Sequence, residues 1–152
     1  MEFKGDSYKV NIWDTTGQEK FSSLTNTYFR GCSGVLLTCD MSSLEHIPTI
    51  DFWYNEMKDH MINEVPKILV GTKGDMMNEV SEDVLGQIAE KKEMSWILTS
   101  AKNNQNIEEA FILLLERVIE HKKELIKEDN KEEVVVQRLN GNAPLQKKKK
   151  CC

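Results

Sequence analysis

The stretch Trp13-Asp14-Thr15-Thr16-Gly17-Gln18-Glu19-Lys20-Phe21 decides how the rest of the chain is interpreted. It follows a segment, Tyr8 to Trp13, in which apolar and polar residues alternate as in a strand with one buried face. Asp14 ends that predicted strand, and Gly17-Gln18 opens into a predicted helix. A turn that only caps a helix is the plainer interpretation, and it stays open for this stretch alone.

The remaining chain alternates between short apolar runs and helical patterns. Runs at 35–39, 67–70 and 96–98 suit strands buried on both faces of a parallel sheet. Helical spacing of apolar residues covers 44–61 and 107–119, and Ser81 predicts the N-cap of a third helix. Glu2-Phe3 and the turn after it predict a short hairpin at the start of the chain. The expected fold class is α/β, with a mostly parallel sheet flanked by helices.

Charge and composition divide the chain at residue 125. Residues 126–152 carry a net charge of +3 and the preceding residues −8, which together give −5. We expect a folded domain over 1–125 and a flexible tail over 126–152 that includes a polybasic run. An acidic body is a poor nucleic-acid binder, whereas a basic tail suits an anionic membrane surface, so no nucleic-acid partner is expected.

The four cysteines do not have the spacing of a disulfide framework or of a zinc site. Cys32 and Cys39 are interpreted as reduced thiols, and the other two are adjacent at the end of the chain. The polar start shows no secretory signal, and no apolar run has the length of a membrane span. The expected location is therefore cytoplasmic, unless something attaches the chain to a membrane.

Two further polar motifs follow predicted strands. Thr72-Lys73-Gly74-Asp75 comes after the run at 67–70, and Thr99-Ser100-Ala101-Lys102 comes after the run at 96–98. Because ligands of open α/β sheets bind at the carboxyl ends of the strands, these motifs and Asp14 are expected to meet at one edge. Each motif alone could be an ordinary surface turn, but their order and their placement after strands favour a site.

These motifs, in this order, resemble the C-terminal two-thirds of a small GTPase of the Rab family. The resemblance implies GTP or GDP and Mg²⁺ as ligands. It assigns Asp14 to magnesium through a water, Gly17 to the terminal phosphate, and Gln18 to the attacking water as the catalytic residue. Thr16 stands where Rab proteins usually have alanine. In the guanine-specificity motif, Thr72 stands where the family usually has asparagine.

The same resemblance assigns the guanine base to the later motifs. Asp75 would accept two hydrogen bonds from guanine that adenine cannot offer, and the stem of Lys73 would lie across the base. The loop Ser100-Ala101-Lys102 would offer a backbone N–H to the guanine carbonyl.

Features specific to Rab proteins concern partners and membranes. Trp13 and Tyr28 match two aromatic residues that Rab proteins present to effectors, although both residues could equally belong to a core. Cys151-Cys152 resembles a double prenylation signal, and the lysines at 147–150 would add attraction to an anionic leaflet. The implied partners are effectors, exchange and activating proteins, the prenylation machinery and, through the lipid, the cytosolic face of intracellular membranes.

No phosphate-binding motif of the form Gly-x-x-x-x-Gly-Lys-Ser/Thr occurs in the sequence. By resemblance, the first strand, the phosphate loop and the first switch are lacking, so the expected fold is an incomplete Ras-like one. We expect this chain alone to bind GTP no tighter than about millimolar and to be inactive as a hydrolase. We also expect it to be unstable, to aggregate, or to complete its sheet with another chain. The alternative function is a nucleotide-free, lipid-anchored protein-binding module.

Overall fold

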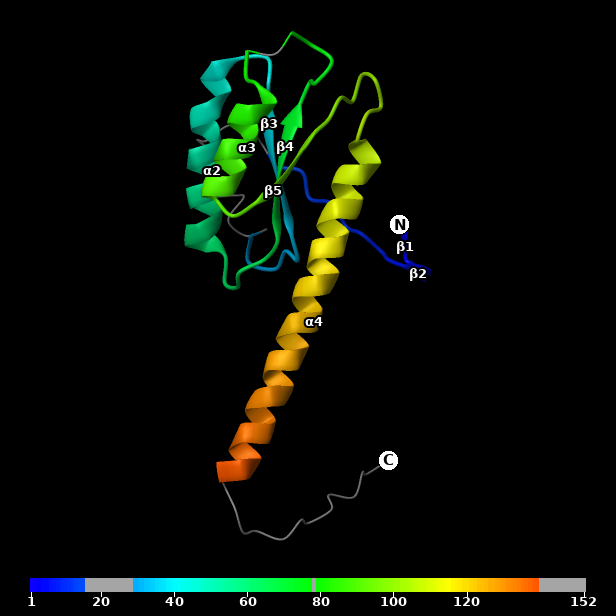
Figure 1. Cartoon of the computed structure of the whole chain (residues 1–152), viewed down its shortest axis with the longest axis vertical. Helices are drawn as coiled ribbons and strands as arrows, with labels where there is room; N and C mark the ends of the chain where they lie inside the picture. The colour runs from blue at the N-terminus through cyan, green and yellow to red at the C-terminus, as the bar shows by residue number, and fades with distance from the viewer. Residues whose placement is uncertain (16–28, 78, 140–152) are drawn as a thin grey trace. The chain divides into compact units, whose positions relative to one another are not determined.

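The computed structural model describes the backbone of residues 1–15, 29–77 and 79–139. By its internal contacts the chain forms two compact units, Met1–Ile119 and Glu120–Cys152. The first unit holds a sheet with helices, shown in Figure 1. The second contains the continuation of the last helix, α4 (Ile107–Leu139). No helix in the described part of the chain is long and apolar enough to cross a membrane.

Three parallel strands form the main sheet in the order β3 (Val35–Asp40), β4 (Lys67–Thr72), β5 (Ser95–Leu98). The pairing register places Asp40 beside Thr72 and Gly71 beside Leu98, so the three strands end at the same edge. β4 is buried along almost its whole length because it lies between the other two strands. The predicted parallel α/β fold with strands at these three runs is therefore confirmed. The predicted burial on both faces holds for β4 but not for its neighbours, since Thr38 of β3 and Trp96 of β5 are exposed.

Helices α2 (Ile47–His60) and α3 (Glu82–Lys91) cover one face of the sheet. The short 3₁₀ helix η2 (Leu44–His46) leads into α2, and Pro48 stands in its first turn, where a missing N–H costs nothing. Ser81 caps α3 as predicted, since its hydroxyl accepts the Val84 N–H at 3.3 Å.

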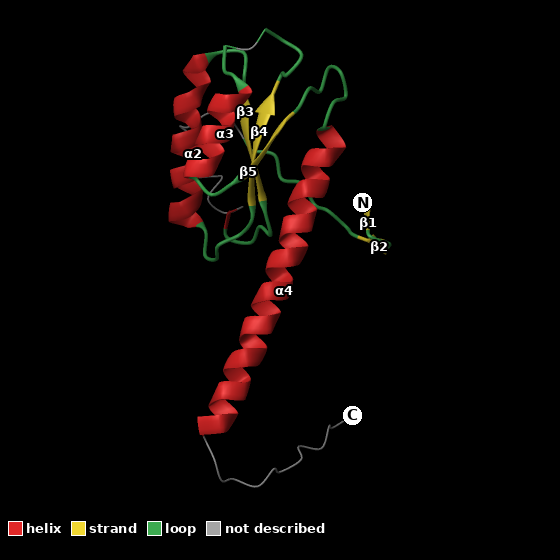
Figure 2. Ribbon diagram, in the orientation of Figure 1, coloured by secondary structure: helices red, strands yellow, loops and turns green. Residues whose placement is uncertain are grey.

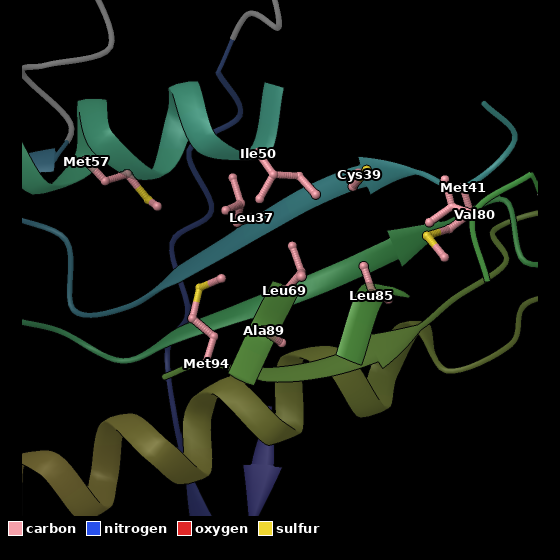
Figure 3. Close-up of a cluster of buried hydrophobic side chains, with 10 residues drawn as sticks. All are labelled: Leu37, Cys39, Met41, Ile50, Met57, Leu69, Val80, Leu85, Ala89 and Met94. Carbon is pink, nitrogen blue, oxygen red and sulfur yellow. The ribbon is translucent and has the colours of Figure 1, made fainter. Parts of the chain in front are cut away.

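The core lies between these helices and the sheet. Figure 3 shows its members from β3, β4, α2, α3 and the loops around them, all at most 8% exposed: Leu37, Cys39, Met41, Ile50, Met57, Leu69, Val80, Leu85, Ala89 and Met94. Five of these side chains are aliphatic residues of β3, α2, β4 and α3. These strands and helices alternate along the sequence, and their apolar patterns predicted the fold.

The hairpin predicted at the start of the chain is confirmed. β1 (Glu2–Phe3) pairs antiparallel with β2 (Asp6–Ser7) across a two-residue turn, in which Lys4 and Gly5 have φ of 50° and 87°. Two positive φ values in succession are typical of a type I′ turn.

One prediction about regular structure was wrong. Tyr8–Trp13 forms no strand: the segment is drawn as loop in Figure 2, and Ile12 and Trp13 are 68% and 69% exposed. Its alternating pattern is correct for an edge strand, but no described strand pairs with it, and a strand is stable only within a ladder. α4 continues to Leu139, into the segment for which a flexible tail is predicted. The apolar stripe ends near 119, yet the residues after it are good helix formers such as Lys and Glu.

Candidate functional site

The loops after β4 and β5 are joined by backbone hydrogen bonds. The Thr99 N–H donates to the Gly71 carbonyl at 2.7 Å, and the Gly74 N–H donates to the Thr99 carbonyl at 2.9 Å. A Cβ on Gly74 would lie 2.9 Å from Leu98 Cγ, so only glycine allows the two loops to approach this closely. The two predicted motifs are thus held together as one unit at the edge of the sheet.

Asp75 is at the centre of this unit. Its side chain is only 8% exposed, and its two oxygens receive the Ser100 hydroxyl at 2.5 Å and approach the Lys102 ammonium at 3.6 Å. The hydrogen bond from Ser100 and the nearby charge of Lys102 hold the pKa of Asp75 below its usual value. Asp75 is therefore an ionised acceptor at neutral pH, held in one orientation.

Ser100 fixes the loop that carries Ala101 and Lys102. Its side chain is fully buried, its backbone forms a bridge with Gln105, and its oxygen also accepts the Asn103 N–H at 3.1 Å. Ala101 is exposed at the start of the turn, and the Lys102 side chain is 79% exposed. The sequence predicted these residues as a loop near Asp75, and the structure brings them together.

A second acid lies beside this unit and was missed by the sequence analysis. Asp40, the last residue of β3, pairs with Lys73 at 2.5 Å and accepts the backbone N–H and the hydroxyl of Ser42 at 2.9 and 2.7 Å. Burial raises the pKa of Asp40, but the hydrogen bonds from Lys73 and Ser42 outweigh it, so the pKa falls to about 2. The sequence contained a signal for Asp40, because this acid follows a predicted strand directly. Asp14 and Asp75 were predicted as site residues on the same basis.

Lys73 and Thr72 connect the two strands. Lys73 has a φ of 60°, an uncommon value for a residue with a side chain, and its ammonium is directed to Asp40. The Thr72 hydroxyl donates to the Cys39 carbonyl at 3.2 Å. Thr72 thus stabilises the junction of β3 and β4. The Lys73 side chain is 54% exposed, so its aliphatic stem is available as an apolar surface.

The described contacts of this cluster do not include Asp14. Asp14 is exposed and follows a loop, and the contacts that orient Asp75 come from Ser100 and Lys102. Gly17, Gln18 and Tyr28, together with the terminal Cys151 and Cys152, lie outside the described residues. Trp13 is described and largely exposed.

Chemically, the cluster can accept N–H groups of a ligand and offer it a small apolar surface. A fixed carboxylate can accept the two N–H groups on one edge of guanine, and the Lys73 stem offers a surface for the ring. In the part of the chain that is described, no three His, Cys, Asp or Glu side chains gather to hold a metal ion.

The fold and this cluster define an α/β protein with polar loops gathered at the carboxyl edge of a parallel sheet. Residues 1–120 match the Ras family. Over its full length the chain is 35% identical to Ras-related protein Rab-10 of Diplobatis ommata and covers 74% of that protein. It is 37% identical to RABD2b of Arabidopsis thaliana and 40% identical to Rab-18 of Lymnaea stagnalis, over 75% and 79% of this chain respectively.

The chain belongs to the Ras family, and its relatives identify it as a Rab-like small GTPase. It spans only 57% and 60% of the length of the RABD2b and Rab-18 relatives. The resemblance stated from the sequence motifs is therefore confirmed at the level of the family.

Proposed function

We propose that this chain is a Rab-type guanine-nucleotide-binding protein of vesicle traffic, in which the described residues provide recognition of the base. The observation that carries this proposal is the orientation of Asp75 by Ser100 and Lys102 at the joined ends of β4 and β5. Effectors, exchange proteins and activating proteins are the partners that such a role requires. Nucleotide binding by this chain is expected to be weak, because the described residues supply no cradle for phosphates.

The test is the choice between bases. In a titration followed by NMR, guanosine is expected to shift the amide resonances of Asp75 and of residues 100–102, whereas adenosine leaves them unchanged. Asp75→Asn should abolish these shifts, because a neutral amide presents a donor to the guanine N–H groups. Asp83→Asn, which removes an exposed acid from α3, is the matched control and should leave the titration unchanged. Equal shifts with both nucleosides contradict the proposal.

Membrane attachment is proposed to follow from prenylation of Cys151 and Cys152. Two lipids, or one lipid with the lysines at 147–150, give stable anchoring where one chain alone is marginal. The acceptors are tested by mass spectrometry of the chain expressed in eukaryotic cells. The expected result is a mass increase of two isoprenoids, reduced to one in Cys152→Ser and to none when both cysteines are replaced; an unmodified wild-type chain contradicts it.

A second candidate is a protein-binding module that works without nucleotide. The exposed apolar side chains of Val10, Ile12 and Trp13 favour it, since apolar residues adjacent on a surface often mark interaction sites. The base titration distinguishes the two functions, because such a module requires no response to guanosine.

A further inference from the structure

One edge of the main sheet is open in the described part of the chain, since β3 pairs there only with β4. The Val35 N–H donates to Pro66 and the Met41 N–H to Thr72, both toward the β4 side. Because backbone groups alternate along a strand, the N–H and C=O of Leu36 and Thr38 point away from β4. An edge with unpaired donors and acceptors is a template for another strand.

The face of the sheet beside this edge is incompletely covered. A Cβ on Gly34 would lie 2.8 Å from Val118 and 2.9 Å from Leu114, which places the apolar stripe of α4 against the start of β3. The stripe residues Phe111, Leu114, Leu115 and Val118 are nevertheless only half-buried. The side chains of Leu37 and Cys39 are buried on one face of β3. The side chain of Thr38, which lies between them in the sequence, points to the opposite face and is exposed. Apolar surface for one face of a further strand is thus present.

The same chain contains a segment with the matching pattern. The donor segment, Tyr8–Trp13, has six residues, as β3 has, and belongs to no described strand. Tyr8, Val10 and Ile12 alternate with Lys9 and Asn11, so as a strand the segment would have one fully apolar face, while Trp13 would lie on the other face with Lys9 and Asn11. Val10 and Ile12 are 41% and 68% exposed in the single chain. A strand with one apolar face suits an edge that is flanked by apolar side chains on one side.

We propose that two copies of this chain associate by exchange, with the donor segment of each copy adding to the β3 edge of the other. Each copy has one donor segment and one open edge. When two copies exchange donor segments, both edges are paired and no further copy can add to the dimer. In the single chain the segment is a loop and does not pair with its own β3. Backbone atoms of Met1 and Tyr8 form two hydrogen bonds, at 2.8 and 2.9 Å, and Lys4 pairs with Glu116 of α4 at 2.8 Å. The proposal does not depend on nucleotide binding.

The mass of the full chain in solution tests this proposal, measured by sedimentation over a range of concentrations. The expected species has twice the 17.5 kDa of one chain. Ile12→Lys should weaken association by at least about tenfold, because it removes a buried isoleucine from the interface. Ile62→Lys is the matched control, since Ile62 is 71% exposed, close to the 68% of Ile12, and lies outside the donor segment and β3. It should leave association unchanged.

A second variant tests the acceptor. Thr38→Pro removes an outward N–H, while the bonds of β3 to β4 come from the alternate residues, so proline is tolerated at this edge. Thr38→Pro alone should be monomeric. Mixed with Ile12→Lys, it should form a heterodimer, because one copy retains the donor segment and the other retains the edge. Two variants that failed to fold would not regain association when they are mixed. A monomeric wild-type chain, equal effects of Ile12→Lys and Ile62→Lys, or no association in the mixture overturns the proposal.

Discussion

At the scale of single residues, two carboxylates organise the edge of the sheet in different ways. Asp75 is held by a hydroxyl and a distant ammonium, which leaves capacity to accept further hydrogen bonds from a ligand. Asp40 is engaged by Lys73 and by two groups of Ser42, so its role is to join the loops after β3 and β4. The acid that the sequence analysis missed therefore joins the two loops, and the acid that it selected keeps the acceptor capacity that the proposed base recognition requires.

Replacing Asp40 by asparagine should destabilise the fold by on the order of 1 kcal/mol, because the ion pair with Lys73 is partly exposed and therefore screened. The melting temperature should fall by about 2–4 °C at pH 7. The pKa of Asp40 is lowered to about 2, so its stabilisation is complete above about pH 4 and is lost as the pH falls toward 2. Thermal unfolding of both proteins between pH 2 and 7 should converge at the acidic end; a constant difference contradicts this assignment.

Gly74→Ala should destabilise the chain by about 1–3 kcal/mol, because the new methyl group would lie 2.9 Å from Leu98 and 3.2 Å from the Thr99 carbonyl. The shift of the loop should also displace Asp75 and weaken the response to guanosine. Chemical denaturation measures the first effect and the NMR titration the second. Gly31→Ala is the matched control, since its added methyl group meets nothing within 4 Å, and it should change stability by less than about 0.5 kcal/mol.

At the scale of elements, the sequence predicted those parts whose stability depends on their own pattern. The strands β3, β4 and β5 are short apolar runs, and α2 and α3 carry apolar stripes that face them, so local pattern and packing agree. Tyr8–Trp13 has a strand pattern without a described partner strand, and pattern alone does not provide one. The cluster at the edge of the sheet shows the same difference. The position of each motif after a predicted strand predicted that Asp75 and Ser100 meet. The pairing of Asp40 with Lys73 depends on loop geometry, which the sequence pattern does not provide.

The continuation of α4 beyond residue 125 should contribute helix content but little stability. Leu125 and Ile126 are 46% and 60% exposed, and the apolar stripe that packs on the sheet ends before them. Truncation after Leu125 should therefore reduce the helical circular dichroism signal per molecule while the melting temperature changes by less than about 2 °C. A larger decrease would show that residues 126–139 stabilise the sheet domain.

At the scale of the whole molecule, the proposed site consists of contacts to the base. Asp75 is a fixed carboxylate and Lys73 offers an apolar stem, while the sequence contains no phosphate-loop motif and the described residues include no group of three metal-binding side chains. Two or three base contacts of about 1–3 kcal/mol each would give millimolar affinity at best after the costs of association. The binding free energy should then come almost entirely from the base.

The prediction is that guanosine and GTP bind this chain with dissociation constants in the millimolar range that differ by less than about threefold. Removal of Mg²⁺ with a chelator should leave both values unchanged, since no described residue links the metal to the base contacts. Calorimetry or NMR titration of both ligands, with and without Mg²⁺, makes the comparison. Micromolar binding of GTP that requires Mg²⁺ would mean that residues 16–28 build a phosphate site, and Gln18 and Gly17 would then be the first residues to replace.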